Sequence, residues 1–117
     1  MTHFADRLEA AIEDQGAPIC VGIDPHLELI PRSFFEETLP SYENGEDGLC
    51  EVAASFCFEL LDVLAEAGVR VVKPQVAFFE ALGASGMEAY QSICMAAKTH
   101  EMVVIADVKR GDIGSTA

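Results

Sequence analysis

The stretch VVIADVKRGDIGSTA, residues 103–117, begins as an apolar run and ends in a cluster of charges. A continuous apolar run of this kind is typical of a strand buried in a parallel sheet. In an extended chain, Asp107 and Lys109 would point to the same face as Val103 and Ile105, because side chains alternate along a strand. The residues between them would point the other way, toward packing helices: Val104, Ala106 and Val108. The pattern therefore predicts an acid and a base side by side at the end of a buried strand.

Two earlier stretches have the same form. Residues 19–23 are apolar and are followed by Asp24, and residues 69–72, apolar except for Arg70, are followed by Lys73. Stretches with apolar residues every three or four positions separate the three predicted strands. Strands alternating with amphipathic helices are the pattern of a parallel sheet covered by helices, so the sequence predicts an α/β fold.

The sequence also predicts the limits of three helices. The first is capped by Thr2 and stopped by Gly16. The second covers residues 49–67, with an apolar face formed by Val52, Phe56, Leu60, Val63 and Leu64. The third begins at a capping box of Ser85 and Glu88, with an inner stripe of Met87, Tyr90, Cys94 and Ala97. Residues 26–48 contain two prolines and a solvated turn, and they are expected to be irregular.

All three predicted strands end in a charged residue, and these are Asp24, Lys73 and Asp107. Ligands of parallel sheets and of (β/α)8 barrels bind at the carboxyl ends of the strands. For one such charge, a solvated strand end is the simpler interpretation. Three consecutive strands with the same feature favour a binding or catalytic site over that interpretation.

Composition excludes several classes of protein. The 117 residues are 50% hydrophobic and 23% charged, which is typical of a globular chain. The net charge of −13 argues against nucleic acid as a partner. No stretch has the length and apolarity of a signal peptide or a membrane span. The four cysteines form no metal-binding pattern, which favours reduced thiols and a cytoplasmic protein.

Three motifs resemble those of one enzyme family, orotidine 5′-phosphate decarboxylase. IADVKRGDIGSTA, residues 105–117, resembles the signature of that family. VKPQVAFFEALG, residues 72–83, resembles the second strand of one subfamily, and CVGIDPHLELIP, residues 20–31, resembles its first strand and loop. The motifs occur in the family's order and are spread over nearly the whole chain.

The resemblance implies a (β/α)8 TIM barrel, of which this chain supplies about the first three βα units. Such barrels need about 250 residues, so residues 1–117 are expected to be the N-terminal part of a single barrel domain. The phosphate-gripping and pyrimidine-reading residues of the family would lie in the part of the barrel outside this chain. The 117 residues alone are therefore not expected to be active.

The resemblance also implies a carbon–carbon lyase that makes UMP in pyrimidine biosynthesis without a cofactor or a metal. The network of alternating charges implied for the site consists of Lys73, Asp107, Lys109 and Asp112. Lys109 would stabilise the carbanion and donate the proton, while Asp24 and Lys73 would hold the ribose hydroxyls. Ile113, Thr116 and Asp112 would complete the site of the neighbouring subunit in a homodimer with shared active sites.

Two alternatives remain open from the residues. Sister barrel enzymes that act on sugar phosphates share the Asp-x-Lys-x-x-Asp pattern, but they use a magnesium ion held by acidic residues. The chain could also be a non-catalytic part of a barrel that binds a sugar phosphate or a partner. The residues around Lys109 and Lys73 fit the orotidine enzyme better than the metal-dependent relatives.

Overall fold

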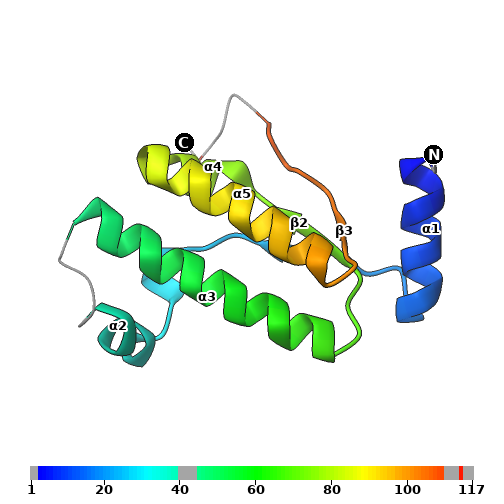
Figure 1. Ribbon diagram of the computed structural model, residues 1–117, viewed down its shortest axis with the longest axis horizontal. Helices are drawn as coiled ribbons and strands as arrows, with labels where there is room; N and C mark the ends of the chain where they lie inside the picture. Colours follow the sequence, from blue (N-terminus) through cyan, green and yellow to red (C-terminus); the bar gives the residue numbers. More distant parts are fainter. Residues whose placement is uncertain (1–2, 40–44, 110–113, 115–117) are drawn as a thin grey trace.

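A computed structural model describes residues 3–39, 45–109 and 114 of the chain. Helices and strands alternate as the sequence predicts, and Figure 1 shows their arrangement. The strands are β1 (Val21–Ile23), β2 (Val71–Pro74) and β3 (Val103–Val104). The helices are α1 (Phe4–Gln15), the 3-10 turn η1 (Leu27–Leu29), α2 (Arg32–Thr38), α3 (Glu46–Glu66), α4 (Val76–Glu80) and α5 (Gly83–Thr99).

The three strands form one parallel sheet in the order β1-β2-β3, which confirms the predicted sheet. Val72 pairs with Val21 on one side and with Val104 on the other. Because the strands are parallel, their carboxyl ends meet at one edge of the sheet. None of the helices described is long and apolar enough to cross a membrane.

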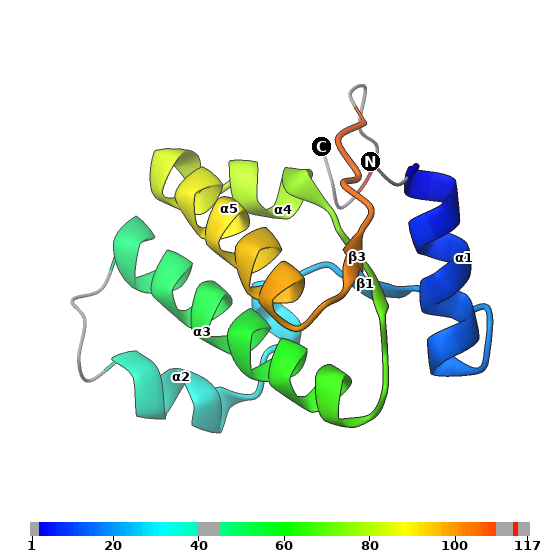
Figure 2. The ribbon, with the colours of Figure 1, turned by 45° about the vertical axis from the view of Figure 1, so that its right-hand side comes forward.

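The two faces of the sheet are covered by different helices. On one face, Ile23 and Val72 pack with Leu61 of α3 and Ile93 of α5 in a buried cluster. On the other face, α1 packs on the sheet through a smaller cluster of Leu8, Ala11, Val71, Val103 and Ile105. Figure 2 shows α1 across the sheet from α3 and α5. In a barrel, the first face would be the outer one and the second would be the inner one.

Helix α1 ends as predicted and begins one residue later than predicted. Gly16 has a φ of 75° and its N–H bonds to carbonyls of the last turn, which is a left-handed cap that glycine adopts without strain. The N-cap is His3, and its side chain makes no capping hydrogen bond. Thr2, the predicted cap, lies outside the described residues. The helix is therefore held by its packing on the sheet rather than by a side-chain cap.

Helix α3 buries Val52 and packs Leu64 on the core as predicted, but its most buried residues near the sheet follow a shifted stripe. Val63 is 61% exposed, whereas Cys57 and Leu61 are fully buried against the sheet. Ala53 is also buried, one turn before Cys57. Small residues at i and i+4 let the neighbouring elements approach closely, so the contact face follows size as well as hydropathy. A pattern based on large apolar residues alone missed this shift.

The segment expected to be irregular contains helix α2. Pro31 is its N-cap residue. Proline is favoured at the start of a helix because an N–H there would have no acceptor within the helix. Phe34 of this helix packs edge-on against Phe56 of α3, with ring centroids 5.5 Å apart. An aromatic contact made by tertiary packing thus stabilises a helix too short to be evident from periodicity.

The start of α5 and the start of β1 also differ from the prediction. Helix α5 begins at Gly83, and Ser85 donates a hydrogen bond to the Asp47 carboxylate of α3, 3.1 Å away, instead of forming a capping box. Gly86 is required, because a Cβ there would lie 1.9 Å from the carbonyl oxygen of Phe79. Ile19 and Cys20 precede β1 and are exposed, so the first strand is shorter than predicted.

Candidate active site

The predicted rim of charges forms at the carboxyl ends of the three strands. Gly22 of β1 pairs with Lys73 of β2, and Asp24 follows two residues later. Beyond β2, Gln75 forms an isolated parallel bridge with Asp107. The sheet register therefore brings Asp24, Lys73 and Asp107 to the same edge, as the sequence predicted.

The alternation of side chains assigns these residues to the inner face. Val103 and Ile105 pack with α1 on that face, whereas Val104 packs with the helix-covered core on the other. This confirms the predicted split for Val103, Val104 and Ile105. Ala106 and Val108, which were predicted to point toward packing helices, are exposed instead. Lys73 lies two residues after Val71, and Asp107 lies two residues after Ile105, so both continue the inner face toward its carboxyl edge.

Asp107 and Lys109 form a close ion pair. Lys109 Nζ lies 2.6 Å from Oδ1 and 2.7 Å from Oδ2 of Asp107, and the Lys109 N–H also donates to Oδ1 at 3.5 Å. The Asp107 side chain is only 5% exposed, whereas the Lys109 side chain is 75% exposed. A nearly buried carboxylate thus holds an exposed ammonium group at the carboxyl edge of the sheet.

The pKa of the Asp107 carboxyl lies below its usual range. The hydrogen bond from the Lys109 side chain is the largest cause, and burial of the carboxyl opposes it. The backbone N–H and the charge of Lys109 lower the pKa further, and so does the charge of Lys73. Asp107 is therefore ionised at neutral pH, and Lys73 lies close enough to act on it electrostatically.

Glycine leaves room in the first strand at this edge. Gly22 has no side chain opposite Lys73, and a Cβ there would meet only Asp24 Oδ1, at 3.7 Å. Asp24 and Lys73 are both exposed at the rim. The inner face thus has two exposed charged side chains beside a position with none, which suits a small polar ligand.

Other predicted site residues lie outside the described part of the chain. These are Asp112, Ile113 and Thr116. The structure places Asp24, Lys73, Asp107 and Lys109 and brings Asp107 and Lys109 into contact.

The sequence missed two features of this rim. The first is Gln75, which directly follows Lys73-Pro74 and lies between the ends of β1 and β3. Counting two residues on from Lys73 would have found it.

The second missed feature is an aromatic contact between His26 and Phe78, whose ring centroids are 4.4 Å apart. The His26 side chain is 27% exposed, and this contact joins the loop after β1 to α4. The next residue of α4, Phe79, is fully buried in the core.

Comparisons with known proteins agree with the motifs. The family model described as "Orotidine 5'-phosphate decarboxylase / HUMPS family" matches residues 17–117. Orotidine 5′-phosphate decarboxylase of Rhodopirellula baltica is 41% identical over 117 residues, covering 100% of this chain and 37% of that protein. The enzyme of the same name from Nocardioides sp. is also 41% identical, covering 100% of this chain and 38% of that protein.

Solved structures show the same fold. A crystal structure from Streptomyces avermitilis superposes with a TM-score of 0.68 at 35% identity, covering 99% of this chain and 36% of that one. Leishmania donovani OMP decarboxylase superposes with a TM-score of 0.61 at 26% identity, covering 98% and 36%. The three parallel strands and their helices correspond to about a third of a (β/α)8 barrel.

The chain spans somewhat more than a third of the length of the curated relatives that it matches. The family match itself covers all of the chain from Ala17 onward, including the three strands and the residues that form the rim. The chain therefore belongs to the orotidine 5′-phosphate decarboxylase / HUMPS family.

Proposed function

We propose that this chain is the N-terminal part of a single-domain barrel enzyme that converts orotidine 5′-phosphate to UMP. The observation that carries the proposal is the Asp107–Lys109 pair, in which a nearly buried carboxylate holds an exposed ammonium at the carboxyl edge of a parallel sheet. The names of the two curated relatives support the same reaction. The activity belongs to pyrimidine biosynthesis in the cytoplasm.

The chemistry requires a cation beside the carbon that loses its carboxylate. The bond between C6 of the pyrimidine and the carboxylate carbon breaks, CO2 leaves, and the electron pair stays on C6. The Lys109 ammonium stabilises this negative charge and then donates a proton to C6, and the resulting amine regains a proton from water. Asp107 holds the ammonium in place before the reaction, so little reorganisation is needed when the charge develops.

The other residues are assigned to substrate binding and to the dimer. Asp24 and Lys73 are exposed at the rim and would hold the ribose hydroxyls, with Lys73 also part of the charged network. Asp112, Ile113 and Thr116 would reach the neighbouring subunit's site in a homodimer. These assignments rest on the family motif, because the last three residues lie outside the described part of the chain.

The matching family has a second branch, HUMPS. The main competing proposal is therefore the metal-dependent reaction on a sugar phosphate that the sequence left open. Lys109 supplies the electrophile in the proposed mechanism, and no metal takes part. We therefore expect that decarboxylation by the complete protein survives dialysis against excess EDTA without loss. Loss of turnover that magnesium restores would favour the metal-dependent branch instead.

The decisive experiment substitutes Lys109 in the complete protein that carries this chain. We expect Lys109→Ala to lower kcat for orotidine 5′-phosphate by at least about a thousandfold, because carbanion stabilisation and proton donation are both lost. Release of CO2 and formation of UMP are measured together. Binding of UMP should persist, since the sugar and phosphate contacts are made by other residues.

Lys98→Ala is the matched control. Lys98 is an exposed lysine in the last turn of α5, away from the rim. Its removal changes the net charge by the same amount, and we expect wild-type turnover. A decrease of only a few-fold in Lys109→Ala, or an equal loss in both variants, would refute the role of Lys109.

A further inference from the structure

Gln75 lies in the middle of the rim. It has extended backbone angles, with φ −96° and ψ 116°, so the strand geometry of β2 continues through it. Its N–H donates to the carbonyl of Ile23 at 3.2 Å, and it pairs with Asp107, whose carbonyl accepts from the N–H of Val76 at 3.0 Å. The backbone of Gln75 is thus fixed between the ends of β1 and β3.

The side chain of Gln75 belongs to the inner face. Val71 packs on that face against α1, and residues at intervals of two share a face in an extended strand, which adds Lys73 and Gln75. Paired residues of neighbouring strands lie on the same face, so Gln75 is also a neighbour of the Asp107 side chain. Gln75 therefore stands among the charged groups assigned to the reaction.

The amide oxygen of this side chain is buried without a hydrogen bond. Among the described residues, no donor lies within hydrogen-bonding distance of Gln75 Oε1. Buried carbonyl oxygens are almost always paired, because an unpaired one loses its hydration without compensation. Such a group beside a candidate active site indicates a donor supplied by the bound substrate.

We propose that Gln75 Oε1 accepts a hydrogen bond from a ribose hydroxyl of the bound nucleotide, an inference that rests on the proposed function. The phosphate and the carboxylate of the substrate are anions and have no proton to donate. The ring N3–H lies across the pyrimidine ring from C6, so it points away from the rim when C6 faces Lys109. The sugar hydroxyls are the donors that remain, and a hydroxyl can also accept from Lys73.

The test compares nucleotides with and without each hydroxyl in the complete protein. Dissociation constants are measured by calorimetry for UMP, 2′-deoxy-UMP and 3′-deoxy-UMP, in the wild type and in Gln75→Leu. We expect Gln75→Leu to weaken UMP binding about tenfold, because one hydrogen bond is lost. For one of the two deoxy analogues, wild type and variant should bind equally well, since the hydroxyl that Gln75 contacts is already missing.

A stability measurement separates this role from a structural one. Without nucleotide, Gln75→Leu should melt at the wild-type temperature or above, because it removes an unpaired buried oxygen. Tyr90→Phe is the matched control. It removes another buried side-chain oxygen, that of a tyrosine on α5 which lies beside Cys94 and whose ring packs on Phe79, and it should leave UMP binding unchanged.

Each outcome decides between the two proposals. If Gln75→Leu weakens UMP and both deoxy analogues by the same factor, or lowers the melting temperature while binding stays normal, Gln75 has a structural role and the inference is wrong. The proposed function would stand in that case. If the wild-type protein binds none of the three nucleotides, the proposed function fails, and the inference fails with it.

Discussion

The two ends of the sheet hold their cations in opposite ways. At the amino ends of the strands, Arg70 has a side chain that is 29% exposed and an acidic partner, Asp14, that is mostly exposed. At the carboxyl ends, the acid Asp107 is 5% exposed and its cation Lys109 is 75% exposed. The first arrangement buries the cation among protein groups, and the second buries the acid and presents the cation.

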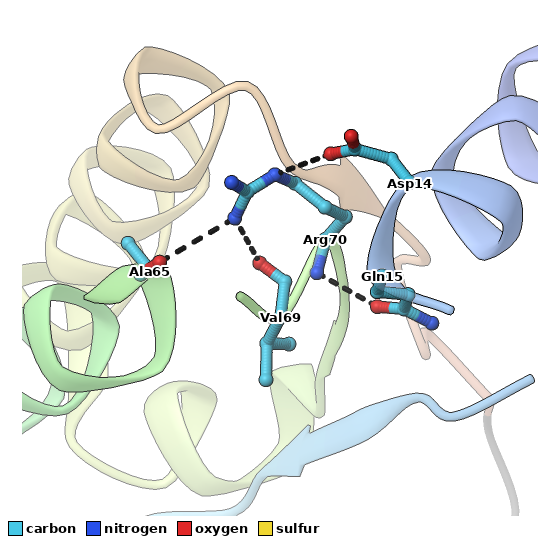
Figure 3. A network of polar contacts seen from close by, with 5 residues as sticks. All are labelled: Asp14, Gln15, Ala65, Val69 and Arg70. Atoms are coloured by element: carbon cyan, nitrogen blue, oxygen red, sulfur yellow. Dashed lines mark hydrogen bonds and ion pairs between the residues drawn. The ribbon is translucent and has the colours of Figure 1, made fainter. Parts of the chain in front are cut away.

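The Arg70 network joins three elements, as Figure 3 shows. Its Nε donates to Asp14 Oδ2 at 2.9 Å, and its Nη1 donates to the carbonyls of Val69 at 2.9 Å and Ala65 at 3.5 Å. Its backbone N–H donates to Gln15 Oε1 at 2.8 Å. The guanidinium lies at the C-terminal end of α3, where a positive charge is favourable. Helix α1 is thus tied to the start of β2 and to the end of α3.

A cavity of about 520 Å³ lies beside this network, between α1 and the starts of β2 and β3. Its lining includes three cations and two acids: Arg7, Arg70, Lys98, Asp14 and Glu101. Arg70 already donates to protein oxygens, so the cavity offers less unpaired positive charge than the count of cations suggests. In barrel enzymes the amino end of the sheet serves stability and the carboxyl end serves catalysis. The two networks follow this division.

The prediction with the largest expected effect tests whether each active site at the carboxyl end combines residues of two chains. Asp112 lies outside the described residues, and the proposed function assigns it to the neighbouring subunit's site. If it completes the neighbour's site, mixed dimers of Lys109→Ala and Asp112→Ala contain one site with both lesions and one with neither. We expect two inactive variants to recover up to about half of wild-type activity per mixed dimer.

Subunit exchange is verified independently, with differently tagged variants purified over two affinity steps. A mixture of Lys109→Ala with Lys109→Ala carrying the second tag serves as the control and should stay inactive. Mixed dimers that show no more activity than the separate variants would mean that Asp112 works within its own chain. The rim would then be complete in each chain, as the Arg70 network is.

A smaller effect is expected at the amino end. Arg70→Met in the complete protein should lower the free energy of unfolding by about 1–3 kcal/mol, because several hydrogen bonds from a charged donor are lost. Turnover of the folded protein should not change, since Arg70 lies at the opposite end of the sheet from Lys109. Denaturant unfolding and steady-state kinetics on the same sample measure the two effects.

Arg32→Met is the control for this prediction. Arg32 also has an acidic neighbour, Glu36 at 3.4 Å, but its side chain is 92% exposed, so its loss should cost less than about 1 kcal/mol. Equal losses for the two arginines would show that the Arg70 network is an ordinary surface pair. A large decrease in kcat for Arg70→Met would break the division between a structural end and a catalytic end.

The sequence predicted those parts of the molecule that depend on local pattern. Buried strands, their parallel pairing and the alternation at Val103, Val104 and Ile105 follow from periodicity, and all are confirmed. Helix α2 was missed, and so was the burial of Cys57 and Leu61 on α3, because both depend on tertiary contacts. The contact of Phe34 with Phe56 joins residues far apart in the chain, and no local pattern reports it.

The same limit applies to the site. Lys73, Asp107 and Lys109 were predicted because charges at strand ends are visible in the sequence. Gln75 was missed because a neutral amide beside a proline is unremarkable until the register pairs it with Asp107. The Arg70 network was missed as well, since it depends on α1 folding back onto β2, and that contact joins residues 55 or more positions apart. Long-range pairing therefore determines what the sequence alone leaves hidden.

The smallest expected effect is the pH dependence of stability that Asp107 contributes. Its pKa is lowered in the folded protein, chiefly by the hydrogen bond from Lys109, so the ionised carboxylate stabilises the fold. That contribution is fully present above the unfolded value, about 3.9, and it is lost as the pH falls through the lower folded value. Asp107→Asn lacks this contribution at every pH.

The difference in unfolding free energy between wild type and Asp107→Asn should therefore be constant near neutral pH and shrink below about pH 4. A difference between wild type and Asp107→Asn that grows as the pH falls would mean that the buried carboxylate destabilises the fold, and that Lys109 does not compensate for its burial.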